Sequence, residues 1–574
     1  MKKLIILLAF FISGFAFSQS PVKAKKASKA TPANPIDCVD CKIDKKGPGL
    51  QNRGDIVNRN NLYQTGKNNS ANILQVGYGN KSDVDQDGKN QSYDGGYMNK
   101  VDVYQKGKKN ETLIDQNGDD NKGEVTQLGY KNYAKQKVGV GYAEHNIAKV
   151  QQEGKMNTSI QEQYFDNNES HVTQEGDKNY ANTYQSSDAD GVNGSYAEIN
   201  QDGDKNMAEI TQNGSDNNKV INQHGEDNIT VTSQVATFGG DNDSEINQDG
   251  KDNLACVDQV ASYDGENDSD IDQDGKYNKA NVTQRASFGG ENDSDIDQDG
   301  KYNNAKVSQN ASRGGDNDSD IDQEDYNQKA SVKQRVTGHG SDNDSDVDQE
   351  GWSNSAIVDQ NASFGGDNDS DIDQESSFFF PANTANVTQK AMGGDNDSDI
   401  DQDGGKNNAV VNQMTHLGGD NDSDIDQKGY KNDASVVQSV RRTSDNDSEI
   451  DQDGKYNKAC VDQVAILGGH NDSDIDQDGG LFGGSNEASV LQRASWFGRN
   501  YSNIDQDGYK NEAMVDQTAR GGFNKSDIMQ NGAFNSASLV QTSLFGFSNV
   551  SNICQDGTGN TACVQQTGTP NSGI

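Results

Sequence analysis

The stretch that decides the fold reads Asn267-Asp-Ser-Asp-Ile-Asp-Gln273, then Asp-Gly-Lys-Tyr, then Asn278-Lys-Ala-Asn-Val-Thr-Gln284. Side chains alternate between the two faces of a β-strand. In both seven-residue segments this alternation gathers the aliphatic and most of the amide side chains on one face and the charged side chains on the other. A helical period would scatter the same apolar residues around the axis. The sequence therefore predicts two strands, each with one inward face, joined by a short turn.

The same pattern recurs along the chain. Glutamines stand 25 residues apart at Gln248, Gln273, Gln298 and Gln323, and again at Gln402, Gln427, Gln452 and Gln477. In most units another glutamine follows 11 residues later, as at Gln259, Gln284, Gln309 and Gln334. Each unit is thus two strands and two turns, and a period this persistent is typical of solenoids. We predict an all-β protein, a β-solenoid of stacked two-strand repeats.

Stacking would place every inward residue about 4.8 Å from its equivalents in the neighbouring units. Inward glutamine and asparagine columns can then form amide ladders, with alanine and valine filling the space between the sheets. A glycine in the connecting turn relieves the tight bend because it lacks a Cβ atom. The predicted core ladder comprises Gln273, Gly275, Asn278, Ala280, Val282, Gln284, Gln298, Gly300, Asn303, Ala305, Gln309, Gln452, Gly454, Asn457, Ala459 and Gln463.

The composition excludes several classes of protein. Only 30% of the 574 residues are hydrophobic, 62 are glycine, and the formal net charge is −41. Such values usually indicate disorder, because little apolar surface is available to offset chain entropy. A repeat array escapes this outcome because each unit buries its few apolar residues against identical neighbours. The negative charge argues against nucleic acid as a partner, since that binding depends on lysine and arginine.

The two ends of the chain differ from the repeats. Residues 1–18 have a charged start and an apolar run that ends in Ala-Phe-Ser, which predicts a signal peptide and a secreted, extracellular protein. Residues 19–60 form a basic, proline-rich leader, residues 61–566 the repeats and residues 567–574 a tail. No later stretch is long and apolar enough for a transmembrane segment. Cys38 and Cys41 in the leader fit a local disulfide, or no special role, better than half of a metal site.

The outward face of the first strand is strongly acidic. In a stack its aspartates would form columns, and two unit charges about 4.8 Å apart repel by roughly 0.9 kcal/mol even in water. We therefore considered calcium, which prefers carboxylate ligands, against the simpler reading of screening by salt and nearby lysines. The simpler reading is favoured, because repeated solvated charge usually needs no ligand. No cofactor is required, and the candidate calcium columns comprise Asp268, Asp270, Asp272, Asp293, Asp295 and Asp297.

Catalysis has no support in the sequence. The six histidines are isolated, without a recurrent serine or aspartate partner. Pairs of acidic residues occur throughout because the repeat itself is acidic, so none marks a general acid and base. We expect no enzymatic activity.

The pattern Gln273-x-Gly275-x-x-Asn278-x-Ala280-x-x-x-Gln284 resembles the curlin repeat, the repeat of curli amyloid fibres. Asn267 stands where the family usually has serine. The same five positions recur at Gln298, Gly300, Asn303, Ala305 and Gln309, and at Gln452, Gly454, Asn457, Ala459 and Gln463. The family unit is a few residues shorter, and its members usually carry far fewer repeats.

The resemblance implies self-association into amyloid fibres at the cell surface, for adhesion and biofilm matrix. It also implies two partners, an outer-membrane curli-type secretion pore and a nucleator. The alternative is a monomeric calcium-dependent β-solenoid that acts as an adhesin or surface-binding rod. Ice or mineral binding ranks last, because ice binders generally show outward threonine ladders and aspartate dominates here.

Overall fold

The computed structural model describes residues 57–65, 69–88, 98–140, 143–187, 193–313, 315–340, 342–379, 382–479 and 484–568. The predicted signal peptide, nearly all of the leader with its two cysteines, and most of the tail lie outside these ranges. The described residues are strands and turns without any helix, and so include no helix that could serve as a membrane span.

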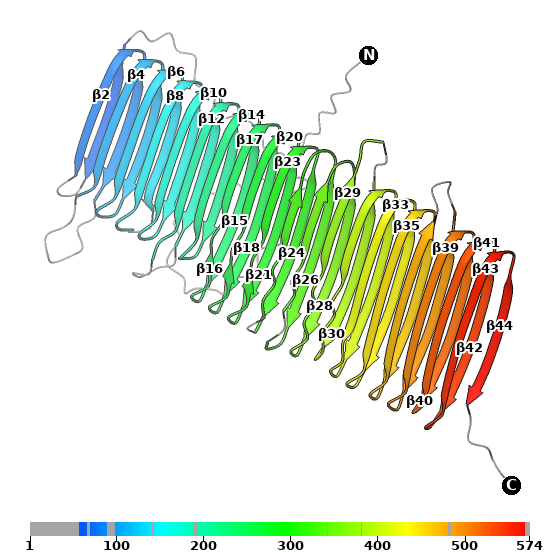
Figure 1. The fold of residues 1–574 in the computed structure, drawn as a ribbon. Helices are drawn as coiled ribbons and strands as arrows, with labels where there is room; N and C mark the ends of the chain where they lie inside the picture. The colour runs from blue at the N-terminus through cyan, green and yellow to red at the C-terminus, as the bar shows by residue number, and fades with distance from the viewer. Residues whose placement is uncertain are drawn as a thin grey trace, which may run out of the picture. The chain divides into compact units, whose positions relative to one another are not determined.

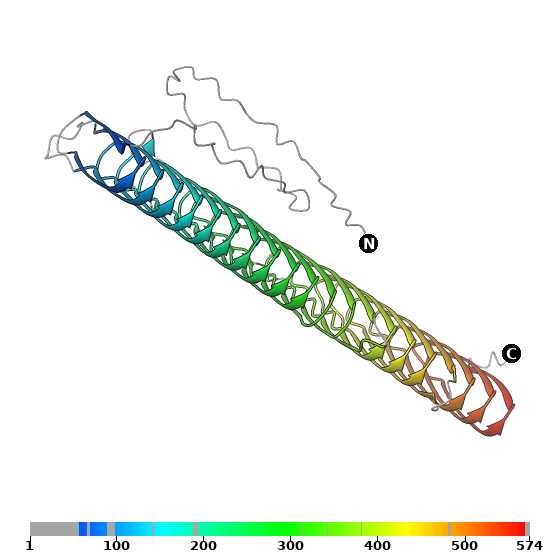
Figure 2. The ribbon, with the colours of Figure 1, turned by 90° about the horizontal axis from the view of Figure 1, so that it is seen from above.

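The chain divides into two compact units. The first comprises the residues up to Asn213 together with 229–234 and 256–258, and the second comprises 214–228, 235–255 and the residues from Gln259 onward. In each unit, parallel strands pair with their equivalents one repeat away (Figure 1). Figure 2 shows the same strands from above, where the backbone winds through successive turns.

The first unit has two parallel ladders. One ladder joins β1 (Arg59–Thr65), β3 (Lys81–Asp87), β5 (Glu111–Asn117), β7 (Tyr133–Val140), β9 (Thr158–Tyr164), β11 (Tyr180–Ser186) and β13 (Met207–Asn213). The other joins β2 (Ser70–Tyr78), β4 (Lys100–Lys108), β6 (Lys122–Tyr130), β8 (Ile147–Lys155), β10 (Glu169–Asp177) and β12 (Tyr196–Asp204).

The second unit also has two main ladders. We call the first the aspartate sheet: β14 (Asn218–Glu226), β17 (Glu245–Lys251), β20 (Asp270–Lys276), β23 (Asp295–Lys301), β25 (Asp320–Gln323), β27 (Asp346–Glu350), β29 (Asp371–Ser376), β31 (Asp399–Gly405), β33 (Asn421–Tyr430), β35 (Asp445–Lys455), β37 (His470–Gly479), β39 (Arg499–Tyr509), β41 (Phe523–Ala533) and β43 (Ser548–Thr558).

The second ladder of this unit, called the opposite sheet, comprises β21 (Lys279–Ser287), β24 (Asn304–Ser312), β26 (Lys329–Thr337), β28 (Ser355–Ser363), β30 (Thr384–Met392), β32 (Asn408–His416), β34 (Asp433–Arg441), β36 (Lys458–Ile466), β38 (Glu487–Ser495), β40 (Glu512–Arg520), β42 (Ser536–Leu544) and β44 (Thr561–Gly568). The remaining strands are β15 (Ile229–Thr237), β18 (Leu254–Ser262) and the short ladder of β16 (Asp241–Asn242), β19 (Glu266–Asn267) and β22 (Glu291–Asn292).

One turn of the second unit, which we call a rung, is a strand of the aspartate sheet followed by a strand of the opposite sheet. Ile271 and Val282, from the two strands of one rung, are 1% exposed or less and form part of the core. The amide of Gln284 crosses the interior and donates to the backbone carbonyl of Asp268. The all-β solenoid with inward amide and aliphatic residues, predicted from alternation, is confirmed.

Two arcs connect the strands of each rung. The glycine arc follows the aspartate sheet, and at Gly275 its backbone has φ +116°. A Cβ atom built there would lie 2.0 Å from the carbonyl oxygen of Gly300 in the next rung. Glycine is therefore required at this position both by the backbone angle and by the close approach of the neighbouring rung. The other arc, which follows the opposite sheet and the strands β15 and β18, is called the aromatic arc for the side chains described below.

Candidate functional site

The glutamines of each sheet form continuous ladders. In the aspartate sheet, Gln273 Nε2 donates to Gln298 Oε1 at 2.7 Å, and Gln298 Nε2 donates to Gln323 Oε1 at 2.7 Å. In the opposite sheet, Gln284 Nε2 donates to Gln309 Oε1 at 3.0 Å. All of these side chains are buried. Each amide therefore serves as donor and acceptor along the stacking direction, as the side chains of cross-β structures do.

Asparagines close the glycine arc. The Oδ1 atom of Asn278 accepts the backbone N–H of Asn303 at 3.2 Å, and its Nδ2 atom donates to the carbonyl of Asp274 in its own rung at 2.9 Å. The same contacts recur at Asn457, which accepts from the backbone N–H of Asn486 and donates to Asp453. The asparagine column thus satisfies backbone groups that the bend removes from the ladders.

The structure places the predicted core ladder residues as follows. Ala280, Val282, Ala305 and Ala459 are buried between the sheets, with the glutamines and asparagines beside them. Gly275, Gly300 and Gly454 lie in glycine arcs at φ between +106° and +116°. Gln452 donates to Gln477, and Gln463 donates to Gln492, so the third predicted repeat has the same contacts as the first two.

Replacing Gln298 by leucine is expected to lower the free energy of unfolding by about 2–5 kcal/mol. The change leaves Gln323 Oε1 without its donor and Gln273 Nε2 without its acceptor in the ladder. A buried polar atom without a partner costs about 1–3 kcal/mol. Asn310→Leu is the matched control, because Asn310 is exposed on the outward side of β24. Chemical denaturation of both variants measures the difference, and equal stability would contradict a structural role for the ladder.

The aspartates stand in rows along the outward side of the aspartate sheet. Asp270 lies in register with Asp295, and Asp295 with Asp320, so one carboxylate follows another at successive rungs. A second row passes through Asp272 and Asp297. Partial burial, and then the neighbouring carboxylates, raise the pKa of Asp295 to about 6. The rows continue beyond these rungs through Asp346, Asp371, Asp399 and Asp424, and through Asp322, Asp348, Asp373, Asp401 and Asp426.

The predicted calcium columns lie in this part of the surface. Asp268 and Asp293 belong to an adjacent row, and burial together with neighbouring carboxylates raises the pKa of Asp268 to about 6. Within the described ranges, no group of three or more histidine, cysteine, aspartate or glutamate side chains has an arrangement that could hold a metal ion. Calcium binding stays a prediction.

One lysine lies inside the solenoid. Lys219 in β14 is 0% exposed and occupies the inward position that serine has in the next rung. Its Nζ atom donates to the Oγ atom of Ser244 at 2.7 Å. Burial lowers the pKa of Lys219 well below its usual value. Lys219 lies two positions before the inward Ile221, so strand alternation alone predicts that it faces the interior. The inward lysine was not predicted from the sequence.

Lys219→Ser is expected to stabilise the protein by about 1–3 kcal/mol at neutral pH, because a buried group with an incomplete set of partners is removed. A lysine whose pKa is lowered by folding destabilises the folded state at low pH and loses this effect as pH rises toward its unfolded value. The stability of the parent protein should therefore rise with pH in the alkaline range more steeply than that of the variant. Thermal unfolding across that range tests this, with the exposed Lys276→Ser as control.

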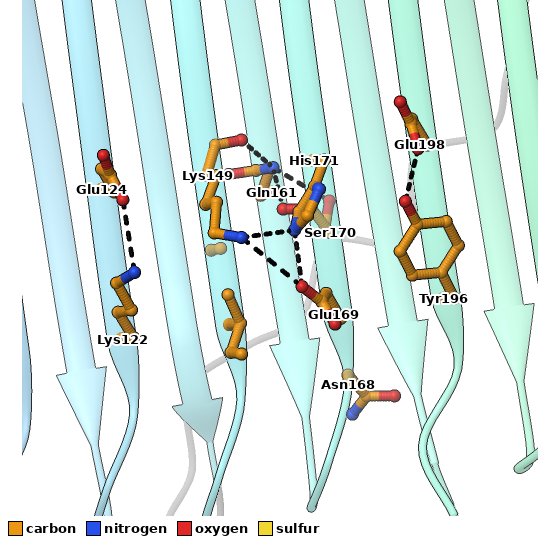
Figure 3. Close-up of polar contacts among 12 residues, drawn as sticks. Lys122, Glu124, Lys149, Gln161, Asn168, Glu169, Ser170, His171, Tyr196 and Glu198 are labelled. Atoms are coloured by element: carbon orange, nitrogen blue, oxygen red, sulfur yellow. Dashed lines mark hydrogen bonds and ion pairs between the residues drawn. The ribbon is translucent and has the colours of Figure 1, made fainter.

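The outward face of the first unit carries a polar cluster, shown in Figure 3. His171 Nε2 lies 2.6 Å from Glu169 Oε1 and 3.0 Å from Lys149 Nζ. The neighbouring Ser170 points to the interior, where its Oγ atom accepts from Gln161 Nε2 at 2.9 Å. Because the serine and histidine lie on opposite faces of β10, they do not form a nucleophile and base pair.

The aromatic arc carries a row of exposed rings that the sequence analysis did not identify. Phe238, Tyr263 and Phe288 stack with ring centroids 4.8 and 4.7 Å apart, nearly parallel. They are 71%, 47% and 58% exposed. All three have φ near +57°, which is uncommon for bulky residues. Their recurrence at a spacing of 25 residues was the signal that could have found them.

These features define a structural repeat protein built of stacked parallel strands and buried amide ladders. Five segments match the family of the Curlin associated repeat: residues 99–129, 193–225, 340–375, 393–429 and 443–479. The chain therefore contains curlin repeats. No curated protein matches the chain. The described rungs between residues 226 and 339 lie outside the matched segments yet have the same ladder geometry.

Proposed function

We propose that this chain is an extracellular structural subunit that self-assembles into curli-like amyloid fibres for surface adhesion and biofilm matrix. The observation that carries the proposal is the register of the ladders. Every rung offers its neighbour the same strand, so a rung of another copy can extend the stack as a rung of the same chain does. A curli-type secretion pore and a nucleator are the further partners that this function implies.

The strand β44 shows where such an addition could occur. Among the described residues it pairs with β42 alone, and the inward Ala562, Val564 and Gln566 are only half-buried. Ser536 at the start of β42 donates its N–H to Asn560, toward the following rung. By the same alternation, the N–H of Gln565 points away from β42 and toward the open edge.

Gln565→Pro is therefore the test of the proposal. Proline removes a donor on the open edge while leaving the β42 ladder intact. We expect wild-type protein to form fibres, measured by thioflavin fluorescence, electron microscopy and fibre diffraction, and the proline variant to nucleate or elongate far more slowly. Gln565→Ala is the control and should assemble like wild type. A wild-type chain that stays monomeric at equilibrium in sedimentation would overturn the proposal.

A second candidate function is a monomeric, calcium-dependent adhesin, favoured by the continuous carboxylate rows of the aspartate sheet. Calcium would offset the repulsion along the rows by bridging carboxylates of adjacent rungs. This function predicts that calcium raises the melting temperature far more than magnesium at equal ionic strength. It also predicts that the protein remains monomeric with calcium. Equal effects of calcium and magnesium on the melting temperature would contradict specific calcium binding and indicate that the cations only screen the carboxylate charges.

A further inference from the structure

The two outward faces of the second unit differ in charge over the same rungs. On the opposite sheet, strands β21, β24 and β26 read KANVTQRAS, NAKVSQNAS and KASVKQRVT. These three strands carry six lysines and arginines and no carboxylate. We call their outward side the basic face. Its cations are Lys279, Arg285, Lys306, Lys329, Lys333 and Arg335.

Strands β20, β23, β25 and β27 of the aspartate sheet alternate with these strands along the chain. Their carboxylates line a groove of about 560 Å³, which we call the acidic groove. Two rows form it, one with Asp270, Asp295 and Asp320 and the other with Asp272, Asp297 and Asp322. The basic face and the acidic groove therefore belong to the same rungs of the solenoid.

Cations are concentrated on these three strands of the opposite sheet. On the opposite sheet, carboxylates return at Asp359 in β28, whose side chain lies 2.8 Å from Lys333. Farther along, Glu487, Glu512 and Asp516 occupy outward positions of β38 and β40. The aspartate sheet, by contrast, remains acidic through β37. A cationic patch on one sheet and an acidic groove on the other sheet of the same rungs favour a contact between identical copies, because each copy then carries both complementary surfaces.

We propose that the basic face of one copy docks laterally on the acidic groove of a second copy. Both surfaces repeat with the strand spacing of about 4.8 Å, and their outward residues alternate with the same period along each strand. Cations and carboxylates can therefore meet over several rungs without a shift along the stack. The cations of the docked basic face offset the mutual repulsion of the carboxylate rows. Docking of two acidic grooves on each other would instead add to that repulsion.

The contact joins two different patches and leaves a free groove on one copy and a free basic face on the other. Such a heterologous contact generates open arrays of laterally associated copies unless the rotation between copies closes a ring. It does not depend on the end-to-end stacking of the proposed function. Lateral association can therefore be measured in the Gln565→Pro background, where elongation is blocked.

The test uses charge reversal on each surface. The basic-face variant is Lys306→Glu, Lys329→Glu and Arg335→Glu, and the groove variant is Asp297→Lys, Asp322→Lys and Asp348→Lys. Sedimentation velocity is measured at ~0.01 M salt, where the Debye length is about 30 Å, and at ~1 M, where it is about 3 Å. We expect the parent protein to form dimers and larger species only at low salt. Each variant alone should lose this association, and an equimolar mixture of the two should form one-to-one complexes.

The control reverses three cations on the arcs, Arg313→Glu, Arg442→Glu and Lys455→Glu, which gives the same change in net charge. We expect it to associate like the parent protein. A parent that is monomeric at low salt, a control that loses association as fully as the basic-face variant, or a mixture that stays monomeric would each overturn the proposal. Circular dichroism of every variant confirms that the strands remain formed.

Discussion

Replacing Gly275 by alanine is expected to destabilise the rung that contains it by about 3–5 kcal/mol. The new Cβ atom would lie 2.0 Å from the carbonyl oxygen of Gly300, a contact that only a backbone shift can relieve. The φ angle of +116° adds strain for any residue with a side chain. Because neighbouring rungs share their ladders, hydrogen exchange should increase in β20 and β23 rather than evenly over the unit.

Gly289→Ala is the matched control for this prediction. Gly289 also has a positive φ angle, +71°, but a Cβ atom there would meet nothing within 4 Å. Gly289→Ala should lower the free energy of unfolding only by the cost of a left-handed backbone conformation, about 1 kcal/mol. Equal destabilisation by the two substitutions would show that backbone conformation, and not the approach of adjacent rungs, requires glycine in the arc.

The second large effect concerns pH. Partial burial, followed by the repulsion of adjacent carboxylates, raises the pKa of Asp268, Asp295 and Asp322 to about 6, above the usual value of 3.8. The folded state therefore binds more protons than the unfolded state between these values. The free energy of unfolding should therefore increase as pH falls from about 7 to about 4. This gain should disappear as pH rises back through 6. We expect the melting temperature to increase by several degrees on acidification.

Neutralising one row tests the cause. The variant Asp270→Asn, Asp295→Asn and Asp320→Asn should melt at a higher temperature than the parent at pH 7 and depend less on pH. The control replaces Asp433, Asp462 and Asp516 of the opposite sheet by asparagine. These three have no carboxylate at the equivalent position of the adjacent rungs. A parent protein whose melting temperature falls steadily from pH 7 to pH 4 would contradict the prediction.

Much of the fold could be predicted from the sequence because strand alternation needs only local information. The position of Ile271 between two aspartates fixes which side chains face inward, and the 25-residue period then fixes the register. Glycine in the arc was equally predictable, although the sequence could not show that the carbonyl of Gly300 closes the space around Gly275.

The surfaces were harder to predict, because they depend on residues that vary between repeats. Lysines at Lys306 and Lys329 stand at different positions of their strands and form one face only after stacking. The rings of Phe238 and Phe288 lie in an arc whose backbone enters the left-handed region, which pattern analysis does not assign to phenylalanine. Lys219 follows the alternation rule but contradicts the expectation that lysine is exposed.

The arcs vary in length while the ladders keep their register. Gln374 and Gln402 are 28 residues apart and Gln477 and Gln506 are 29 apart, yet both pairs are hydrogen-bonded at 2.7 Å. Extra residues between two rungs therefore leave the glutamine ladder in register. A foreign peptide inserted between Phe379 and Asn383 should be carried outside the core in the same way. In the proposed fibre, such insertions would display guest sequences at the spacing of successive copies.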